Sequence, residues 1–208
     1  MKTIFVIRHA EKPAGKIKGI DPNGNADKDS LIVRGWERAG ALADFFGSKD
    51  GLPAPDRIFA SAAQKKATRS AKTRRKKARP AAKKGSKTGS KSKRPTQTVM
   101  ALAAKLGQRV SGKYTKGEEA NLVKAVTALD GKTLVCWQHE AIPKIAGLIV
   151  GSMKGIPKRW PSRRFDVVWQ FTSSKSKWKF DQVCQLVLAG DSAKAIKRQR
   201  SAGRSRRR

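Results

Sequence analysis

Cysteine, histidine and long apolar runs are scarce in this 208-residue chain, which contains two cysteines and two histidines. Cys136 and Cys184 form neither a C-x-x-C pair nor a cluster with histidine, so neither a disulfide framework nor a zinc site is expected. No apolar run approaches the roughly 18 residues of a membrane span, and residues 4–7 are too few for a secretory signal. We therefore expect a soluble, cytoplasmic protein that has no membrane partner.

Acidic residues are also few, because 15 Asp and Glu stand against 48 Lys and Arg and give a formal net charge of +33. Residues 64–94 hold 15 basic residues and residues 194–208 hold 8, and neither segment has an acidic residue. Residues 64–92 also lack large apolar side chains, so burial cannot offset the entropy cost of ordering them. The composition predicts a domain at residues 1–190, interrupted by a disordered polybasic insert at 64–92 and followed by a disordered basic tail at 191–208.

Strand and helix signals alternate along the rest of the chain. Near-continuous apolar runs, typical of strands buried on both faces, occur at residues 2–7, 57–61 and 133–137. Apolar residues at helical spacing predict helices near residues 30–47, 95–107, 118–129 and 142–149. Ser30 is expected to cap the first of these helices, and residues 165–171 and 178–188 predict a β-hairpin at a sheet edge. The alternation indicates a layered α/β domain with a mostly parallel sheet.

Both histidines follow directly after a predicted core strand. His9 follows the first strand and is preceded by Arg8, and His139 follows the strand at residues 133–137. Ligands of such sheets bind at the carboxyl ends of the strands, so we expect the two imidazoles to lie close together. A guanidinium group fits phosphoryl oxygens, a neutral imidazole is a nucleophile, and a second, protonated imidazole would stabilise developing negative charge.

Four ordered motifs carry a family resemblance: RHAE from residue 8, SLIVRGWERAG from residue 30, RPTQT from residue 94 and QHE from residue 138. Together they resemble the histidine phosphatase superfamily, which has the phosphoglycerate-mutase-like fold. The resemblance implies a three-layer sandwich whose mostly parallel central sheet is flanked by helices. It also implies a metal-independent phosphatase without a cofactor, which hydrolyses a phosphorylated small molecule or phosphoprotein through a phosphohistidine intermediate. The residues after His9 lack the Ser-x-Trp-Asn pattern of the mutases, which favours the phosphatase branch.

The resemblance assigns roles to individual residues. His9 would accept the phosphoryl group, and Arg8, Arg94 and His139 would form the phosphate pocket. Arg69 is a weaker candidate than Arg94 for the second arginine, because no Gln-Thr pair follows it. The long insert after Ser61 makes a phosphate-binding role for that serine doubtful.

The proton donor to the leaving group has three candidates. Glu140 directly follows the second histidine, where the acid phosphatase branch has an acidic residue, and we favour it. Glu118 and Glu119 lie between the second arginine and the second histidine, where the mutase branch has its acid. Acidic residues in the first turn of a helix are, however, also expected from the helix dipole alone.

The basic segments favour a second hypothesis, in which the chain is a polycationic binding protein on a phosphatase-like scaffold with little or no turnover. Polycations neutralise phosphates and release counterions, so non-specific binding of nucleic acid or polyphosphate would depend strongly on salt. A solvated loop and tail without a partner is the alternative. Arg159, Arg163 and Arg164 either orient an anionic substrate or are surface charge. The aromatic residues near them alternate as in packed strands and predict core: Trp160, Phe165, Trp169, Phe171, Trp178 and Phe180.

Overall fold

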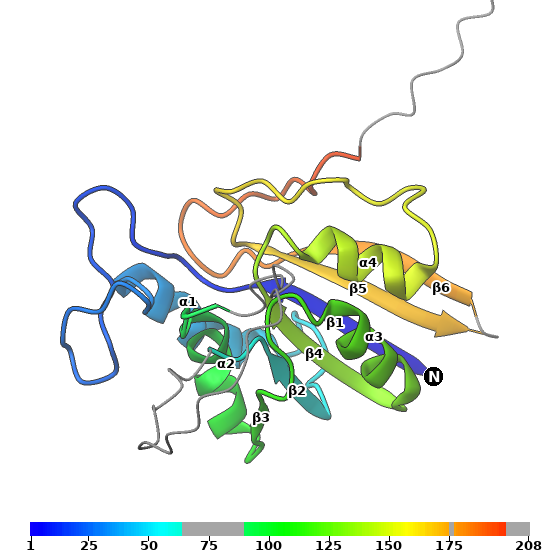
Figure 1. The fold of residues 1–208 in the computed structure, drawn as a ribbon, viewed down its shortest axis with the longest axis horizontal. Coiled ribbons are helices and arrows are strands. Elements are labelled where there is room, and N and C mark those ends of the chain that lie inside the picture. The colour runs from blue at the N-terminus through cyan, green and yellow to red at the C-terminus, as the bar shows by residue number, and fades with distance from the viewer. Residues whose placement is uncertain (64–89, 175–176, 199–208) are drawn as a thin grey trace, which may run out of the picture.

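The computed structural model describes residues 1–63, 90–174 and 177–198 of the chain (Figure 1). Strands and helices follow one another in the order β1 (Lys2–Arg8), α1 (Val33–Phe45), β2 (Arg57–Ala60), α2 (Arg94–Lys105), β3 (Val110–Ser111), α3 (Glu119–Ala128), β4 (Gly131–Trp137), α4 (Ile142–Val150), β5 (Val167–Ser174) and β6 (Lys177–Cys184). The strands form a six-stranded sheet in the order β3-β2-β4-β1-β5-β6.

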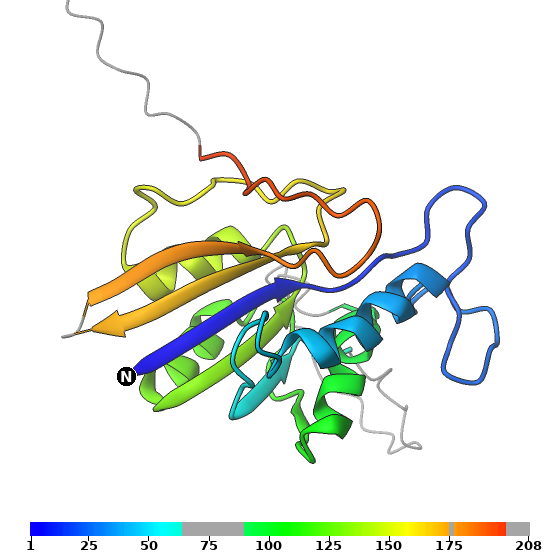
Figure 2. The same cartoon turned by 180° about the vertical axis from the view of Figure 1, so that it is seen from behind.

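Five strands of this sheet run in the same direction. β1 pairs in parallel with β4, β4 with β2, and β2 with β3, whereas β5 is antiparallel to both β1 and β6. Helices α1 and α2 cover one face, and α3 and α4 cover the other (Figures 1 and 2). The predicted three-layer α/β sandwich and its edge hairpin are therefore confirmed.

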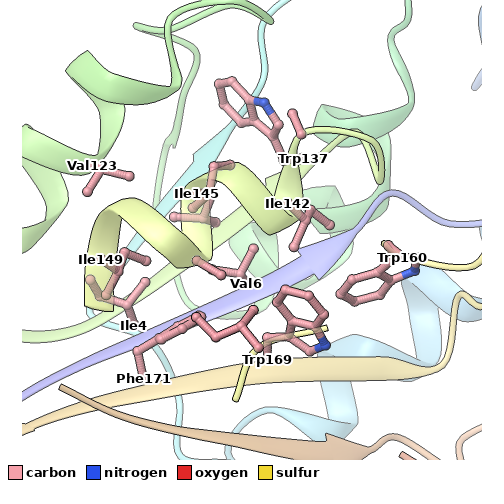
Figure 3. Packing of buried hydrophobic residues seen from close by; sticks show 14 of the residues in the cluster. Ile4, Val6, Val123, Trp137, Ile142, Ile145, Ile149, Trp160, Trp169 and Phe171 are labelled. Atoms are coloured by element: carbon pink, nitrogen blue, oxygen red, sulfur yellow. The ribbon is translucent and has the colours of Figure 1, made fainter. Parts of the chain in front are cut away.

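Alternation along β1 explains why its sequence is apolar throughout. Ile4 and Val6 pack against the residues of α3 and α4, whereas Phe5 and Ile7 face α1 and α2. Figure 3 shows Ile4 and Val6 in the cluster that includes Ile145 and Ile149 of α4, and all four side chains are almost fully buried. Each such burial contributes about 1.5–3 kcal/mol, so β1 is fixed at the centre of the sheet.

The predicted aromatic core is confirmed for the residues on and before the β5–β6 hairpin, with one exception. Trp160, Trp169 and Phe171 are buried in the cluster beneath α4 (Figure 3), and Trp178 and Phe180 pack against it. Phe165 instead lies under the guanidinium group of Arg8, 3.9 Å from its central carbon. It is therefore part of the strand-end site rather than of the core.

Ser30 does not cap the first helix, which begins at Val33 after Ile32. The Ser30 hydroxyl is fully buried, donates to an Asp27 carboxylate oxygen at 2.8 Å and accepts from the Gln97 amide at 2.7 Å. These tertiary hydrogen bonds occupy the oxygen that a capping interaction would have used.

Described residues on the insert side of position 92 and on the tail side of position 191 pack against the domain. Ala63 forms an isolated parallel bridge with Ser90, and Ser92 is buried. At the other boundary, Asp191 binds a buried arginine and Ile196 belongs to the core beneath α4. Packing against the domain thus extends to Ile196, while residues 64–89 and 199–208 lie outside the described residues and their predicted disorder stays a prediction. Among the described helices, none combines the length and the apolar character needed to span a membrane.

Candidate active site at the strand ends

Neighbouring strands bring the two histidines to the same edge of the sheet. Arg8 is in register with Trp137 across the parallel β1–β4 pair, and the backbone amide of His9 donates to the Trp137 carbonyl at 3.1 Å. His139 follows Trp137 by two residues, so both imidazoles lie beyond the carboxyl ends of adjacent central strands. The structure therefore brings both candidate histidines to the carboxyl edge of the sheet, where ligands of such sheets bind.

His9 is held in one tautomer. Its side chain is nearly inaccessible, and Nδ1 lies 2.8 Å from the carbonyl oxygen of Ala10. A carbonyl oxygen can only accept, so Nδ1 must carry the proton and Nε2 must carry the lone pair. Burial, together with the positive charges of Arg8 and Arg94, lowers the pKa of His9 from 6.5 to about 3, so the imidazole is neutral near pH 7.

The first turn of α2 fixes the backbone that follows His9. The hydroxyl of Thr98 accepts from the Ala10 amide at 2.8 Å and donates to the Arg94 carbonyl, also at 2.8 Å. Gln97 accepts the amide proton of Leu31 at 3.0 Å, which ties the same turn to the loop before α1. The RPTQT segment therefore places Arg94 at the start of a helix that is bonded to the loop after His9.

Arg8 is an almost fully buried cation with spare donors. Its Nη1 donates to the carbonyls of Pro161, Ser162 and Arg164 at 3.4, 2.5 and 3.2 Å, and its guanidinium group covers the Phe165 ring. Nε and Nη2 are buried and have no hydrogen-bond partner among the described residues. One edge of the guanidinium group thus holds the loop before β5, and its other nitrogens are free to bind a ligand.

Arg94 has a free donor as well. Its Nη1 donates to the Lys28 carbonyl at 3.1 Å, whereas Nε is buried without a partner among the described residues. Burial lowers the pKa of both arginines, and that of Arg8 falls to about 10 although the charges of Glu140 and Glu11 raise it. A buried donor without a partner costs about 1–3 kcal/mol, so an anion with several oxygens would relieve this cost.

His139 and Glu140 form the other side of the site. Nδ1 of His139 lies 3.0 Å from a Glu140 oxygen, at an angle that makes no hydrogen bond. Burial and the charge of Arg8 lower the pKa of His139, so this imidazole is also neutral before a ligand binds. Burial raises the pKa of Glu140, but the ion pair with Lys116 outweighs it and the pKa is lowered.

The two other candidate acids hold the start of α3. The buried Glu119 accepts hydrogen bonds from the Trp137 indole at 3.2 Å and from Lys144 at 3.0 Å. Glu118 accepts from the amide and the hydroxyl of Thr115, both at 2.8 Å. Of the three acidic residues, Glu140 is the one whose carboxylate contacts a candidate site histidine.

A buried ion network, which the sequence analysis missed, supports the loop after His9 through Glu11. Arg38 binds Glu11 at 2.8 Å and Asp191 at 2.7 Å, and it also donates to Gln185 at 3.1 Å. Burial alone would lower the pKa of Arg38, but Asp191 and Glu11 raise it, so the charge is fully compensated. Gly35 lets α1 approach this loop, because a Cβ there would meet the Glu11 carbonyl at 2.6 Å.

Ser61 has a structural contact beside the site. It is fully buried, and its hydroxyl accepts from the amide of Gln138 at 3.1 Å. Ser61 therefore anchors the residue that precedes His139, from the end of β2. Arg69, the weaker candidate for the second arginine, lies outside the described residues.

The described residues contain no group of three His, Cys, Asp or Glu side chains placed to hold a metal ion. No protein-family model matches the sequence, and no curated protein is similar to it in sequence.

Solved structures do share the fold. A mutant phosphoserine phosphatase from Entamoeba histolytica, in complex with phosphoserine, superposes with a TM-score of 0.52 at 13% identity, over 90% of this chain and 100% of that chain. The protein histidine phosphatase SixA complexed with tungstate gives a TM-score of 0.50 at 10% identity, over 88% and 97%. A mycobacterial glucosyl-3-phosphoglycerate phosphatase complexed with VO3 gives 0.50 at 12%, over 87% and 98%. At this identity the likeness establishes the phosphoglycerate-mutase-like fold, as the sequence motifs predicted.

Proposed function

On a fold shared with histidine phosphatases, we propose that this protein is a metal-independent phosphatase that hydrolyses a phosphomonoester or phosphoprotein through a phosphohistidine at His9. One observation carries the proposal: a neutral imidazole with a fixed tautomer lies beside Arg8, whose Nε and Nη2 are buried and without a partner among the described residues. A structural arginine would have all its buried donors bonded. Donors held free beside a nucleophile suit an anionic substrate.

In the first step, the Nε2 lone pair of His9 attacks the phosphorus atom. A bond from nitrogen to phosphorus forms, and the bond from phosphorus to the leaving oxygen breaks. Arg8 and Arg94 donate to the equatorial oxygens through the whole transfer, and His139 joins them when the bound dianion raises its pKa and it takes up a proton. The hydrogen bond from His9 Nδ1 to Ala10 keeps the ring aimed as its charge rises.

Glu140 is the proposed proton donor to the leaving oxygen. Lys116 keeps it ionised before substrate binds, but the negative charge of a bound phosphoryl group raises its pKa and favours the protonated form. In the second step, water attacks the phosphohistidine, Glu140 takes the proton of that water, and the bond from nitrogen to phosphorus breaks. His9 then returns to its neutral form, and inorganic phosphate leaves.

Hydrolysis of para-nitrophenyl phosphate in the presence of EDTA tests this function. We expect turnover with EDTA present, inhibition by vanadate or tungstate, and a phosphoenzyme that is labile in acid and stable in base. The His9→Ala variant should form no phosphoenzyme, whereas Lys124→Gln, an exposed substitution on α3, should match the wild type. A phosphoenzyme that persists in His9→Ala would refute the assignment of the nucleophile.

A second candidate function rests on the charge of the chain rather than on the site. Residues 64–89 hold 12 Lys and Arg and no acidic residue, so the protein could bind nucleic acid or polyphosphate without turnover. Salt-sensitive binding of such polyanions by a protein that hydrolyses no phosphomonoester would favour this alternative.

A further inference from the structure

A cavity of about 550 Å³ lies between the loop that precedes β5 and the C-terminal segment. These two segments run side by side in both views of the ribbon, as the yellow and red parts of the chain (Figures 1 and 2). Six of the ten residues that line the cavity are cationic and none is acidic. We call it the basic cavity, after Lys158, Arg159, Arg163, Arg164, Lys194 and Lys197.

Most of this charge is not neutralised by the protein. Arg164 binds Asp166 at 2.6 Å and donates to the Lys194 carbonyl at 2.8 Å. The other five cationic side chains pair with no carboxylate in the part of the chain that the structure describes. Like charges gathered around a concave surface raise the local positive potential, so the cavity attracts anions.

The basic cavity shares a wall with the active site. Pro161 and Arg164 line it, and the carbonyl oxygens of both residues accept hydrogen bonds from Arg8. Arg163 also lines a smaller cavity of about 260 Å³, together with Phe165, the ring that contacts Arg8. Residues 161–164 therefore lie between Arg8 and the basic cavity, and Arg163 borders both cavities.

We propose that the basic cavity binds further phosphates of the substrate, so that the substrate is a multiply phosphorylated small molecule; this inference rests on the proposed phosphatase function. Its volume lies within the range of roughly 300–1,000 Å³ that is usual for small-molecule sites. Arginine forks and lysine ammonium groups are the side chains that bind phosphate oxygens best. Among the described residues that line the cavity none is aromatic, which disfavours a stacked nucleic acid base.

Two charge-matched triple variants test the inference, with tripolyphosphate as the probe. The cavity triple is Lys158→Gln, Arg159→Gln and Lys197→Gln, all at exposed positions that line the cavity. The control triple is Lys49→Gln, Lys124→Gln and Lys177→Gln, exposed residues that lie outside the cavity. Both triples remove three positive charges and retain residues 64–89 and 199–208, so a difference between them reports on the cavity.

We expect calorimetry at about 0.3 M salt, where distant charges are screened, to show tripolyphosphate binding at least about tenfold weaker in the cavity triple. The control triple should stay within about twofold of the wild type, since its charges lie outside the cavity. Both triples should hydrolyse para-nitrophenyl phosphate as fast as the wild type, because a single phosphate needs only the strand-end site.

Equal affinity of the two triples for tripolyphosphate would overturn the inference, whether or not the protein turns over substrate. A cavity triple that loses affinity for a DNA oligonucleotide and keeps it for tripolyphosphate would also overturn it, in favour of a nucleic acid site. If the wild type hydrolyses no phosphomonoester while the two triples still differ in binding, the proposed function fails and the cavity remains an anion site without a catalytic role.

Discussion

Replacing Arg8 by methionine distinguishes an arginine kept for substrate from one kept for the fold. Holding the Arg8 charge in the structure is costly, because a pKa lowered from 12.5 to about 10 corresponds to about 3 kcal/mol. Its two shorter hydrogen bonds to the carbonyls before β5 return about 3–6 kcal/mol together, at about 1.5–3 kcal/mol for each bond from a charged group. The two terms largely offset each other, so Arg8→Met should lower the free energy of unfolding by no more than about 3 kcal/mol.

The same substitution should remove most of the activity. Nε and Nη2 of Arg8 have no partner within the described part of the chain, and two charge-assisted hydrogen bonds from them to a phosphoryl group would stabilise the transition state by about 3–6 kcal/mol. The expected loss in kcat/KM is therefore about 10²- to 10⁴-fold.

Urea unfolding with and without tungstate measures, on one sample, the change in stability and the loss of anion binding. Tungstate should stabilise the wild type by mass action and should not stabilise Arg8→Met. Arg57→Met is the matched control, because Arg57 is an exposed arginine at the amino end of β2 whose Nη1 also donates to a carbonyl, that of Asp130, at 2.5 Å. A loss of several kcal/mol of stability in Arg8→Met, with the stabilisation by tungstate intact, would show that Arg8 is structural.

The sequence predicted the features that depend on local pattern and on strand order. A run that is apolar at every position, as in residues 2–7, needs a strand buried on both faces, and β1 packs in this way. Once two such strands are parallel neighbours, the residues after them must share one edge of the sheet. The proximity of His9 and His139 therefore follows from the sequence, although 130 positions separate them.

Features that depend on long-range polar contacts could not be predicted. Arg38 meets Asp191 across 153 positions, and no periodicity links the two. Arg8 binds backbone carbonyls. Every residue has a backbone carbonyl, so the sequence does not indicate which carbonyls Arg8 binds. Ile196 is a single buried apolar residue in an otherwise polar segment. One apolar residue makes no periodic pattern, so the composition of residues 191–198 predicts a disordered tail.

Three further predictions test the roles of the nucleophile, the acid and the insert. His9→Ala should reduce turnover to background, as measured by phosphate release. Glu140→Gln should slow hydrolysis of β-glycerophosphate by about 10²- to 10⁴-fold and that of para-nitrophenyl phosphate far less. The reason is that the glycerol alkoxide is the poorer leaving group and needs the proton from the acid. Equal losses with the two substrates would show that another residue is the acid. Replacing residues 64–89 by a short Gly-Ser linker should preserve the fold and the turnover of para-nitrophenyl phosphate. The reason is that Ala63 already pairs with Ser90, so the linker joins neighbouring positions, and the entropy of loop closure changes only with the logarithm of length. Because the deletion removes 12 cationic side chains, it should also make binding to a DNA oligonucleotide or polyphosphate weaker and less dependent on salt. Loss of cooperative unfolding would show that the segment is structural, and an unchanged salt dependence would show that it does not bind polyanions.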